Sequence, residues 1–115
     1  DLVGNSARMG KVTAGLLYDL KAEHPSVGDV RSIGLCGIVE LVNDRRTKEP
    51  MAPFNGSSPE MNALGAFFKE HGLYVYAHWN TFFTNPPLTI SEAELHEAFE
   101  IINAALAITD AAVSG

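Results

Sequence analysis

Residues 79–92 read WNTFFTNPPLTISE, and they hold the end of one element and the beginning of the next. Aromatic and β-branched residues at 81–84 favour a strand. Proline has no N–H to donate to a neighbouring strand, so the strand must end at the double proline, 86–87. Ser91 and Glu94 have the spacing of a capping box, which predicts that a helix begins there. This stretch therefore predicts a strand that is followed directly by a helix.

The residues on either side of this stretch extend the prediction. Residues 73–77 are also aromatic and β-branched, and only residues 78–80 separate them from the strand at 81–84. Two such runs are typical of an antiparallel hairpin with its tip at 78–80. The helix that follows is apolar along one side, at steps of four, three and four: Leu95, Phe99, Ile102 and Leu106.

The first half of the chain contains three further predicted elements. Apolar residues recur at helical spacing from about residue 7 to residue 22, which indicates an amphipathic helix. Residues 29–42 are apolar at period two on one face and largely apolar on the other, which predicts one long buried strand. Residues 43–59 form a polar, proline-containing loop. Residues 57–60 have helix-start chemistry, and Gly72 is positioned to end that second helix.

The order of these elements predicts a segregated α+β fold, with a small antiparallel sheet and helices packed on one of its faces. The chain has 115 residues, which fit a single domain, 1–115. Its formal net charge is −6, so we expect neither nucleic acid nor a membrane surface as a partner. Cys36 is the only cysteine, which excludes an internal disulfide and favours a cytoplasmic location.

Metal and nucleophile sites are not predicted. His96 lies four residues from both Glu92 and Glu100 and would share their helical face, but exposed acid–imidazole pairs explain this spacing better than metal ligands. Cys36 lies within the most apolar predicted strand, where a thiol is expected to be inert packing. We therefore assign no catalytic residue and no metal ligand.

Two polar segments invite an anion-binding interpretation. The turn at residues 55–58 precedes a helix, where free amides attract phosphate, but it lacks the longer glycine pattern of a phosphate loop and is better explained as an N-cap. Arg45 and Arg46 are flanked by Asp44 and Glu49, so an ion-pair cluster is favoured over an anion site.

The hairpin tip concentrates amphipathic side chains. Tyr74, Tyr76 and His78 share one face by alternation, and Trp79 and Phe83 lie close by. Such a cluster is compatible with a hydrophobic core and equally with the wall of a pocket. The candidate pocket residues are Tyr76, His78, Trp79 and Phe83.

Three segments together resemble a known family. They are DVRSIGLCGIVELV at 29–42, DRRTKEP at 44–50, and the segment 80–92 with its PPL-I pattern. In this order and at this spacing they resemble the C-terminal small domain of class III, pyridoxal-phosphate-dependent aminotransferases, over nearly the whole chain. The WN pair at 79–80 and the PPL run at 86–88 are most similar to the taurine or ω-amino-acid:pyruvate branch.

The resemblance implies a parent enzyme that transfers an amino group from an amine or ω-amino acid to a keto acid such as pyruvate. Pyridoxal 5'-phosphate would be the cofactor of that parent, held by a large domain that supplies the Schiff-base lysine. The lysines of this chain match none of the family's lysine positions: Lys11, Lys21, Lys48 and Lys69. We therefore expect a fragment that binds no cofactor and is inactive alone, with the large domain as its partner, in a homodimer.

The resemblance also marks an absence. In many members the small domain offers an arginine to the substrate carboxylate, and the position matches Phe83 in one pattern and Tyr76 in another. This chain has an arginine at neither, so recognition of the acid group would fall to Tyr76, His78 and Trp79 or to another part of the parent. The alternative function is a free-standing α+β binding or dimerisation module that uses the same surface. A third possibility, a small hydrolase or metal enzyme, is not favoured, because the sequence lacks the set of catalytic residues that such an enzyme needs.

Overall fold

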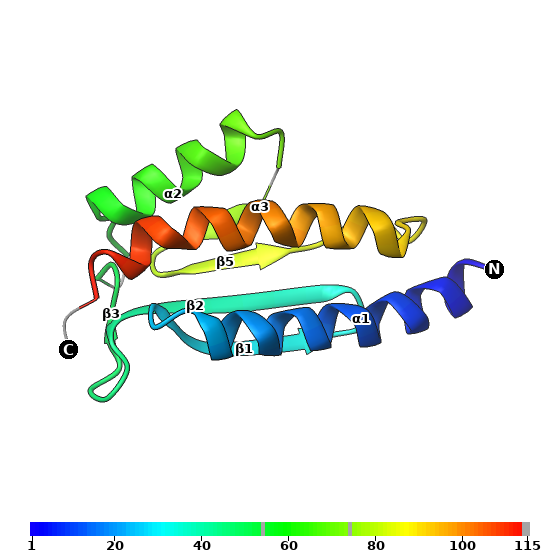
Figure 1. The fold of residues 1–115 in the computed structure, drawn as a ribbon, viewed down its shortest axis with the longest axis horizontal. Coiled ribbons are helices and arrows are strands. Elements are labelled where there is room, and N and C mark those ends of the chain that lie inside the picture. The colour runs from blue at the N-terminus through cyan, green and yellow to red at the C-terminus, as the bar shows by residue number, and fades with distance from the viewer. Residues whose placement is uncertain (54, 74, 114–115) are drawn as a thin grey trace.

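The computed structural model describes residues 1–53, 55–73 and 75–113. Three helices and five strands are described, in this order: α1 (Leu2–Glu23), β1 (Val27–Ile33), β2 (Cys36–Asp44), β3 (Glu49–Pro50), α2 (Pro59–Glu70), β4 (Tyr76–His78), β5 (Thr81–Thr84) and α3 (Glu92–Asp110). The strands pair antiparallel in the spatial order β1-β2-β5-β4, and β3 adds to the end of β2. The α+β prediction is confirmed (Figure 1).

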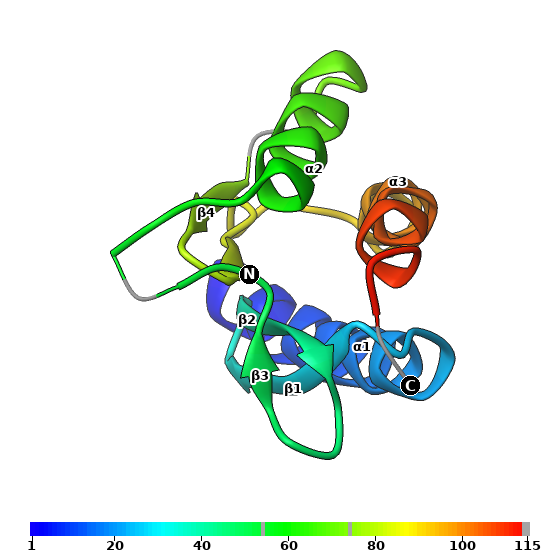
Figure 2. The same ribbon diagram turned by 90° about the vertical axis from the view of Figure 1, so that its left-hand side faces the viewer.

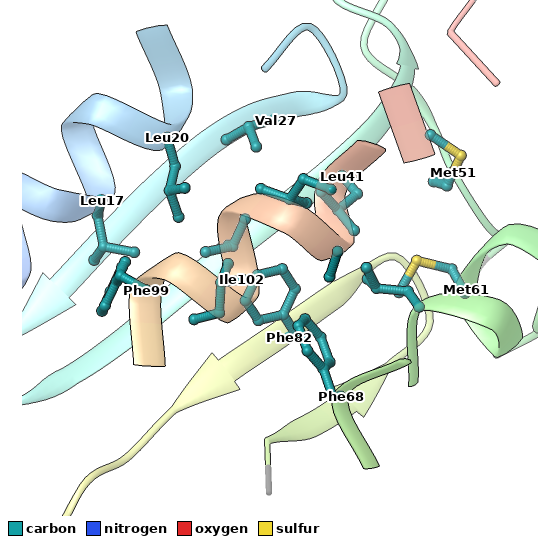
Figure 3. Packing of buried hydrophobic residues seen from close by; sticks show 14 of the residues in the cluster. Leu17, Leu20, Val27, Leu41, Met51, Met61, Phe68, Phe82, Phe99 and Ile102 are labelled. Atoms are coloured by element: carbon teal, nitrogen blue, oxygen red, sulfur yellow. The ribbon is translucent and has the colours of Figure 1, made fainter. Parts of the chain in front are cut away.

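The helices lie on the same side of the sheet, as the view along the long axis shows (Figure 2). Alternation along the strands turns Val39, Leu41 and Phe82 toward these helices, and all three are fully buried. From the helical side, Leu17 and Ile102 pack into the same cluster (Figure 3). The opposite face is covered by no helix in the described part of the chain, and we call it the open face.

The predicted single strand at residues 29–42 is wrong, because the chain reverses inside it. Ile33 pairs with Cys36, so Gly34 and Leu35 form the turn between β1 and β2. Gly34 has φ of +56°, a left-handed conformation that glycine adopts without steric cost. Leu35 is only 5% exposed, so the apolar pattern continues across the turn and conceals the reversal.

Two further boundaries differ from the prediction. The first helix begins at Leu2 and not near residue 7, because the Asp1 carboxylate accepts a hydrogen bond from the Gly4 N–H at 3.1 Å and caps it. The loop predicted at 43–59 contains β3, which pairs Pro50 with Val42. The loop is therefore attached to the sheet and does not run free over the surface.

The predicted helix ends are confirmed. Ser58 caps α2 and its hydroxyl accepts from the Met61 N–H at 3.2 Å, so the turn at 55–58 does serve as an N-cap. Ser91 and Glu94 form both hydrogen bonds of the capping box at the start of α3. Gly72 follows α2 with φ of +73°, as expected for a residue that ends a helix.

Candidate functional site

The four candidate side chains lie together at the hairpin of β4 and β5. The ring centroids of Tyr76 and Phe83 are 5.7 Å apart, those of Tyr76 and His78 are 5.7 Å apart, and those of His78 and Trp79 are 4.1 Å apart. Aromatic rings at these separations attract one another. We call Phe83, Tyr76, His78 and Trp79, in this order of contact, the aromatic row.

The hairpin itself is shorter than predicted. The described strand is Tyr76–His78 and not 73–77, so His78 belongs to β4 and the tip consists of Trp79 and Asn80 alone. Tyr74, which alternation placed on the same face as Tyr76, lies outside the described residues. The tip is small because His78 pairs directly with Thr81, which leaves two residues for the turn.

Strand register places the aromatic row on the open face. Tyr76 on β4 is the partner of Phe83 on β5, and Phe83 is in turn the partner of Ile38 on β2, which pairs with Arg31 on β1. Side chains on one line across a sheet share a face, so these four side chains point away from the helices. Tyr76 is 63% exposed. The row is therefore a surface and not part of the core.

A second, more polar line runs beside the first on the open face. It consists of His78, Thr81, Glu40 and Asp29, which are successive partners across the same four strands. With Arg31 and Ile38, the last three line a shallow groove of about 110 Å³. Two carboxylates thus lie opposite each other, an arrangement that needs nearby cations.

Asp29 has those cations. Desolvation alone would raise the pKa of Asp29, but a hydrogen bond from Arg31, one from the Val30 N–H and the charges of Lys21 and Arg31 outweigh it, so the pKa lies below its usual value. Arg31 Nε lies 3.3 Å from the Asp29 carboxylate. Arg31 is the only arginine or lysine on the two lines of the open face, and its guanidinium is paired with the Asp29 carboxylate.

The hairpin tip is tied to the sheet and to the loop before α2. The Asn80 side chain donates to the Leu41 carbonyl oxygen at 2.9 Å, and the Leu41 N–H donates to the Asn80 carbonyl oxygen at 2.7 Å. The Trp79 indole Nε1 donates to Asn55 Oδ1 at 3.1 Å. From sequence, Asn55 was considered only as part of the turn at 55–58 and not as a partner of the hairpin tip, although its place in an Asn-Gly turn was a signal of unusual backbone.

The lysines of the chain do not form a pyridoxal-phosphate site. Lys21 Nζ lies 3.8 Å from the Asp29 carboxylate, and Lys48 Nζ donates to the Gly28 carbonyl oxygen at 3.3 Å. Lys11 and Lys69 are exposed on α1 and α2. None of the four lines the groove on the open face. The described residues therefore do not fit the cofactor by themselves, since a Schiff base requires a lysine beside a pocket for the ring.

The remaining candidates from sequence have structural roles. His96 and Glu92 form an exposed i,i+4 pair at 3.4 Å, and no group of three metal-ligating side chains occurs in the described part of the chain. Arg45 forms no ion pair among the described residues: its guanidinium donates to the carbonyl oxygens of Val27 in β1 and of Lys21 in the last turn of α1. Cys36 is half-buried at the start of β2.

Two features were not visible from sequence. Leu73, Val75, residues 84–90 and the first half of α3 line an apolar groove of about 240 Å³. Asp110 at the end of α3 accepts from the Ser26 N–H at 3.1 Å and contacts His24 Nδ1 at 2.5 Å. These partners are more than 80 residues apart, so no local pattern reveals them. No described helix has the length and apolar character needed to cross a membrane.

Comparison with known proteins gives consistent matches. A family model described as aminotransferase class-III matches residues 1–106. A taurine–pyruvate aminotransferase of Rhodobacter capsulatus is 39% identical over 108 residues, which are 91% of this chain and 23% of that protein. An isoleucine 2-epimerase of Lentilactobacillus buchneri is 31% identical over 103 residues, covering 89% of this chain and 22% of that protein.

Among solved structures, a taurine:2-oxoglutarate aminotransferase from Bifidobacterium kashiwanohense, in complex with PLP and glutamate, superimposes with a TM-score of 0.91. It is 24% identical, and the match covers 99% of this chain and 26% of that one. The similarity at this identity shows the fold. The chain thus spans about a quarter of the length of the proteins it matches.

Proposed function

Since the chain belongs to the class III aminotransferase family, we propose that residues 1–115 are the C-terminal small domain of a larger aminotransferase. The share of the relatives that it spans, 23% of the Rhodobacter protein, supports this proposal. Pyridoxal 5'-phosphate supplies the electron sink for amino transfer when bound in such an enzyme. The partner is the large domain that holds this cofactor, because the lysines of this chain are exposed or engaged elsewhere. By itself the chain is inactive.

The proposed reaction transfers an amino group from an amine or ω-amino acid to a keto acid such as pyruvate. The similarity to a taurine–pyruvate aminotransferase supports this choice of substrates. The role of this chain is to provide a wall of the substrate pocket. Tyr76, His78, Trp79 and Phe83 form that wall, and their rings exclude water from the part of the donor that does not react.

The observation that carries the proposal is the pairing of Tyr76 with Phe83 on the open face. These two adjacent rings, tilted by 40° to each other, provide an apolar surface without a positive charge, and Arg31 on the same line is paired with Asp29. An arginine fork is the usual partner of a carboxylate. The wall therefore suits an amine donor whose remote end is apolar, or is an anion hydrated more weakly than a carboxylate, such as a sulfonate, better than one that ends in a carboxylate.

We also propose that the complete protein is a cytoplasmic homodimer. The exposed apolar side chains supporting self-association are Leu2, Val3, Ile33 and Leu88. Apart from Ile33, these line a recess of about 320 Å³ at the start of α1. Exposed apolar patches of this kind mark contacts between proteins. The single cysteine supports a reducing compartment.

The test compares this chain with the complete enzyme. Residues 1–115 mixed with pyridoxal 5'-phosphate and reduced with borohydride are expected to show no stoichiometric adduct, whereas the complete enzyme forms one and converts pyruvate to alanine with an amine donor. Stoichiometric trapping on the short chain would overturn the small-domain proposal. Interconversion of amino-acid stereoisomers without consumption of pyruvate would instead favour the chemistry named for the Lentilactobacillus relative.

A further inference from the structure

Trp79 has a backbone conformation that is unusual for its residue type. Its φ is +54°, and it is the first residue of the two-residue turn between β4 and β5. Glycine or asparagine is the usual occupant of such a position, because a side chain with a Cβ is crowded there. A bulky aromatic residue in this conformation must be held by its surroundings, and strain of this kind concentrates at functional sites.

The surroundings that hold Trp79 include Asn55. The indole Nε1 donates to Asn55 Oδ1 at 3.1 Å, across 24 positions of sequence. Asn55 itself has φ of +60°, a conformation that asparagine tolerates better than other residues with a Cβ. Both partners are thus in left-handed backbone conformations, and the hydrogen bond joins the hairpin tip to the loop before α2.

The same two segments are also joined at their base. The Leu41 carbonyl oxygen accepts from the Met51 N–H at 3.0 Å and from the Asn80 side chain at 2.9 Å. The loop before α2 and the hairpin tip are therefore both hydrogen-bonded to Leu41 in β2, and they are joined to each other by the hydrogen bond between Asn55 and Trp79. A closed arrangement of this kind restricts the indole more than either contact does alone, since each attached segment limits the other.

The position of the indole determines the position of the next ring in the aromatic row. The centroids of Trp79 and His78 are 4.1 Å apart, and His78 stacks on Tyr76 with an interplanar angle of 23°. The His78 side chain is exposed, and its ring contacts among the described residues are those with Trp79 and Tyr76. We propose that Asn55 is a positioning residue which, through Trp79, sets the orientation of His78 on the open face and so shapes the substrate wall.

This inference rests on the proposed function only where it is tested by enzyme kinetics. In the complete enzyme, Asn55→Gly keeps the backbone freedom at position 55 but removes the acceptor, so the KM for the amine donor is expected to rise about three- to tenfold, with a smaller change in kcat. Asn55→Asp retains an acceptor oxygen and tolerates the same φ, and is expected to restore the original KM. Lys48→Gly, at a left-handed position in another loop, is the matched control.

Fluorescence provides a readout that needs no activity. Trp79 is the only tryptophan of the chain, so all tryptophan emission from residues 1–115 comes from this indole. Asn55→Gly is expected to shift the emission to longer wavelength and to increase quenching by acrylamide, while Asn55→Asp and Lys48→Gly leave both unchanged. If Asn55→Gly matches the unmodified chain, or Asn55→Asp behaves like Asn55→Gly, the inference is overturned. Absence of amino transfer in the complete enzyme would refute the proposed function while leaving this result to stand.

A second variant covers the case in which Asn55→Gly does not fold. Trp79→Phe keeps a ring against His78 but removes the indole donor, so its KM is expected to rise at least as much as that of Asn55→Gly, since Trp79 is also part of the substrate wall. Where Asn55→Gly folds, the double variant is expected to have the KM of Trp79→Phe alone, because Asn55 then has no indole donor left to bind. Where it does not fold, an unchanged KM for Trp79→Phe overturns the inference. If the factors by which the two changes raise KM multiply in the double variant, Asn55 and Trp79 act independently and the inference is overturned.

Discussion

Tyr76 and Phe83 are direct partners across β4 and β5, with ring centroids 5.7 Å apart on the open face. These are the two positions at which relatives were expected to carry a substrate-binding arginine, in different patterns. They are separated by seven residues in sequence, yet the register makes them neighbours. An arginine at either position would therefore reach the same region above the sheet, and this chain fills that region with two aromatic rings.

Replacing one of these rings with a guanidinium is expected to change donor preference. In the complete enzyme, Tyr76→Arg should raise kcat/KM for a donor with a terminal carboxylate, relative to an uncharged amine, by about tenfold or more. The physical reason is the bidentate hydrogen bond that arginine forms with a carboxylate. The measurement is the ratio of the two kcat/KM values. Ala66→Arg, on the exposed side of α2, is the control for added charge and should leave the ratio unchanged. An equal ratio for Tyr76→Arg and the parent would contradict the substrate-wall proposal.

The predictions made from sequence succeeded where local chemistry determines structure. The capping box at Ser91, the cap at Ser58 and the helix end at Gly72 each depend on neighbouring residues only, and the structure confirms all three. The prediction at 29–42 failed because a buried residue in a turn, Leu35, imitates the pattern of a continuous strand. The spacing of apolar residues does not reveal a chain reversal when the residues of the turn are themselves buried in the core.

The site was predictable only as far as local sequence patterns determine it. Alternation placed Tyr76 and His78 on one face, and the structure brings these rings together with Phe83 and Trp79. Alternation does not say whether that face is core or surface, and this depends on where the helices pack. The partnership of Trp79 with Asn55 depends on tertiary structure, so it was accessible only from the folded chain.

Thr84 provides a prediction about stability. Thr84 is 8% exposed, and among the described residues its Oγ1, which lies against Gly37, has no hydrogen-bond partner. A buried hydroxyl without a partner loses its hydration without compensation. Thr84→Val is therefore expected to raise the free energy of unfolding by about 1 kcal/mol, measured by urea denaturation.

The matched control for this change is Thr109→Val. Thr109 is buried as well, but its hydroxyl donates to the Leu106 carbonyl oxygen at 3.1 Å and lies 2.8 Å from Ser26 Oγ. Here the same substitution is expected to lower the free energy of unfolding by about 1 kcal/mol. Opposite signs for the two valine variants are the expected result, and equal losses would show that Thr84 has a partner in solution.

Asp110 is expected to stabilise the contact between the end of α3 and the beginning of the sheet. A carboxylate at the C-terminal end of a helix is unfavourable for the helix dipole, so its hydrogen bonds must offset that effect. Its Oδ1 accepts from both the N–H and the hydroxyl of Ser26, at 3.1 and 2.6 Å. Asp110→Ala is expected to lower the free energy of unfolding by about 2 kcal/mol, because the Ser26 N–H loses its acceptor. Asp19→Ala, on the exposed side of α1, should change the free energy of unfolding by less than about 0.5 kcal/mol. A similar small change for Asp110→Ala would show that this network contributes nothing to stability.

Asp29 gives a prediction about pH. Its pKa is lowered in the folded chain because Arg31, Val30 and Lys21 favour the charged form more than desolvation opposes it. A carboxyl group of this kind stabilises the fold above its unfolded pKa, and the stabilisation is lost as the pH falls through the folded pKa. Asp29→Asn should therefore be less stable than the parent at about pH 6, and the difference should disappear at about pH 2.

The size of this effect is limited by exposure. The Asp29 side chain is 39% exposed and that of Arg31 is 70% exposed, so solvent and salt screen the pair. The difference at neutral pH is expected to stay below about 1 kcal/mol and to shrink in high salt. Urea denaturation of both chains at the two pH values measures it, and a difference that persists unchanged at low pH would show that packing, not charge, distinguishes the variants. A difference that disappears at low pH would confirm that Arg31 pairs with Asp29 in the folded chain. This result would support the proposal that the open face has no free arginine for the substrate.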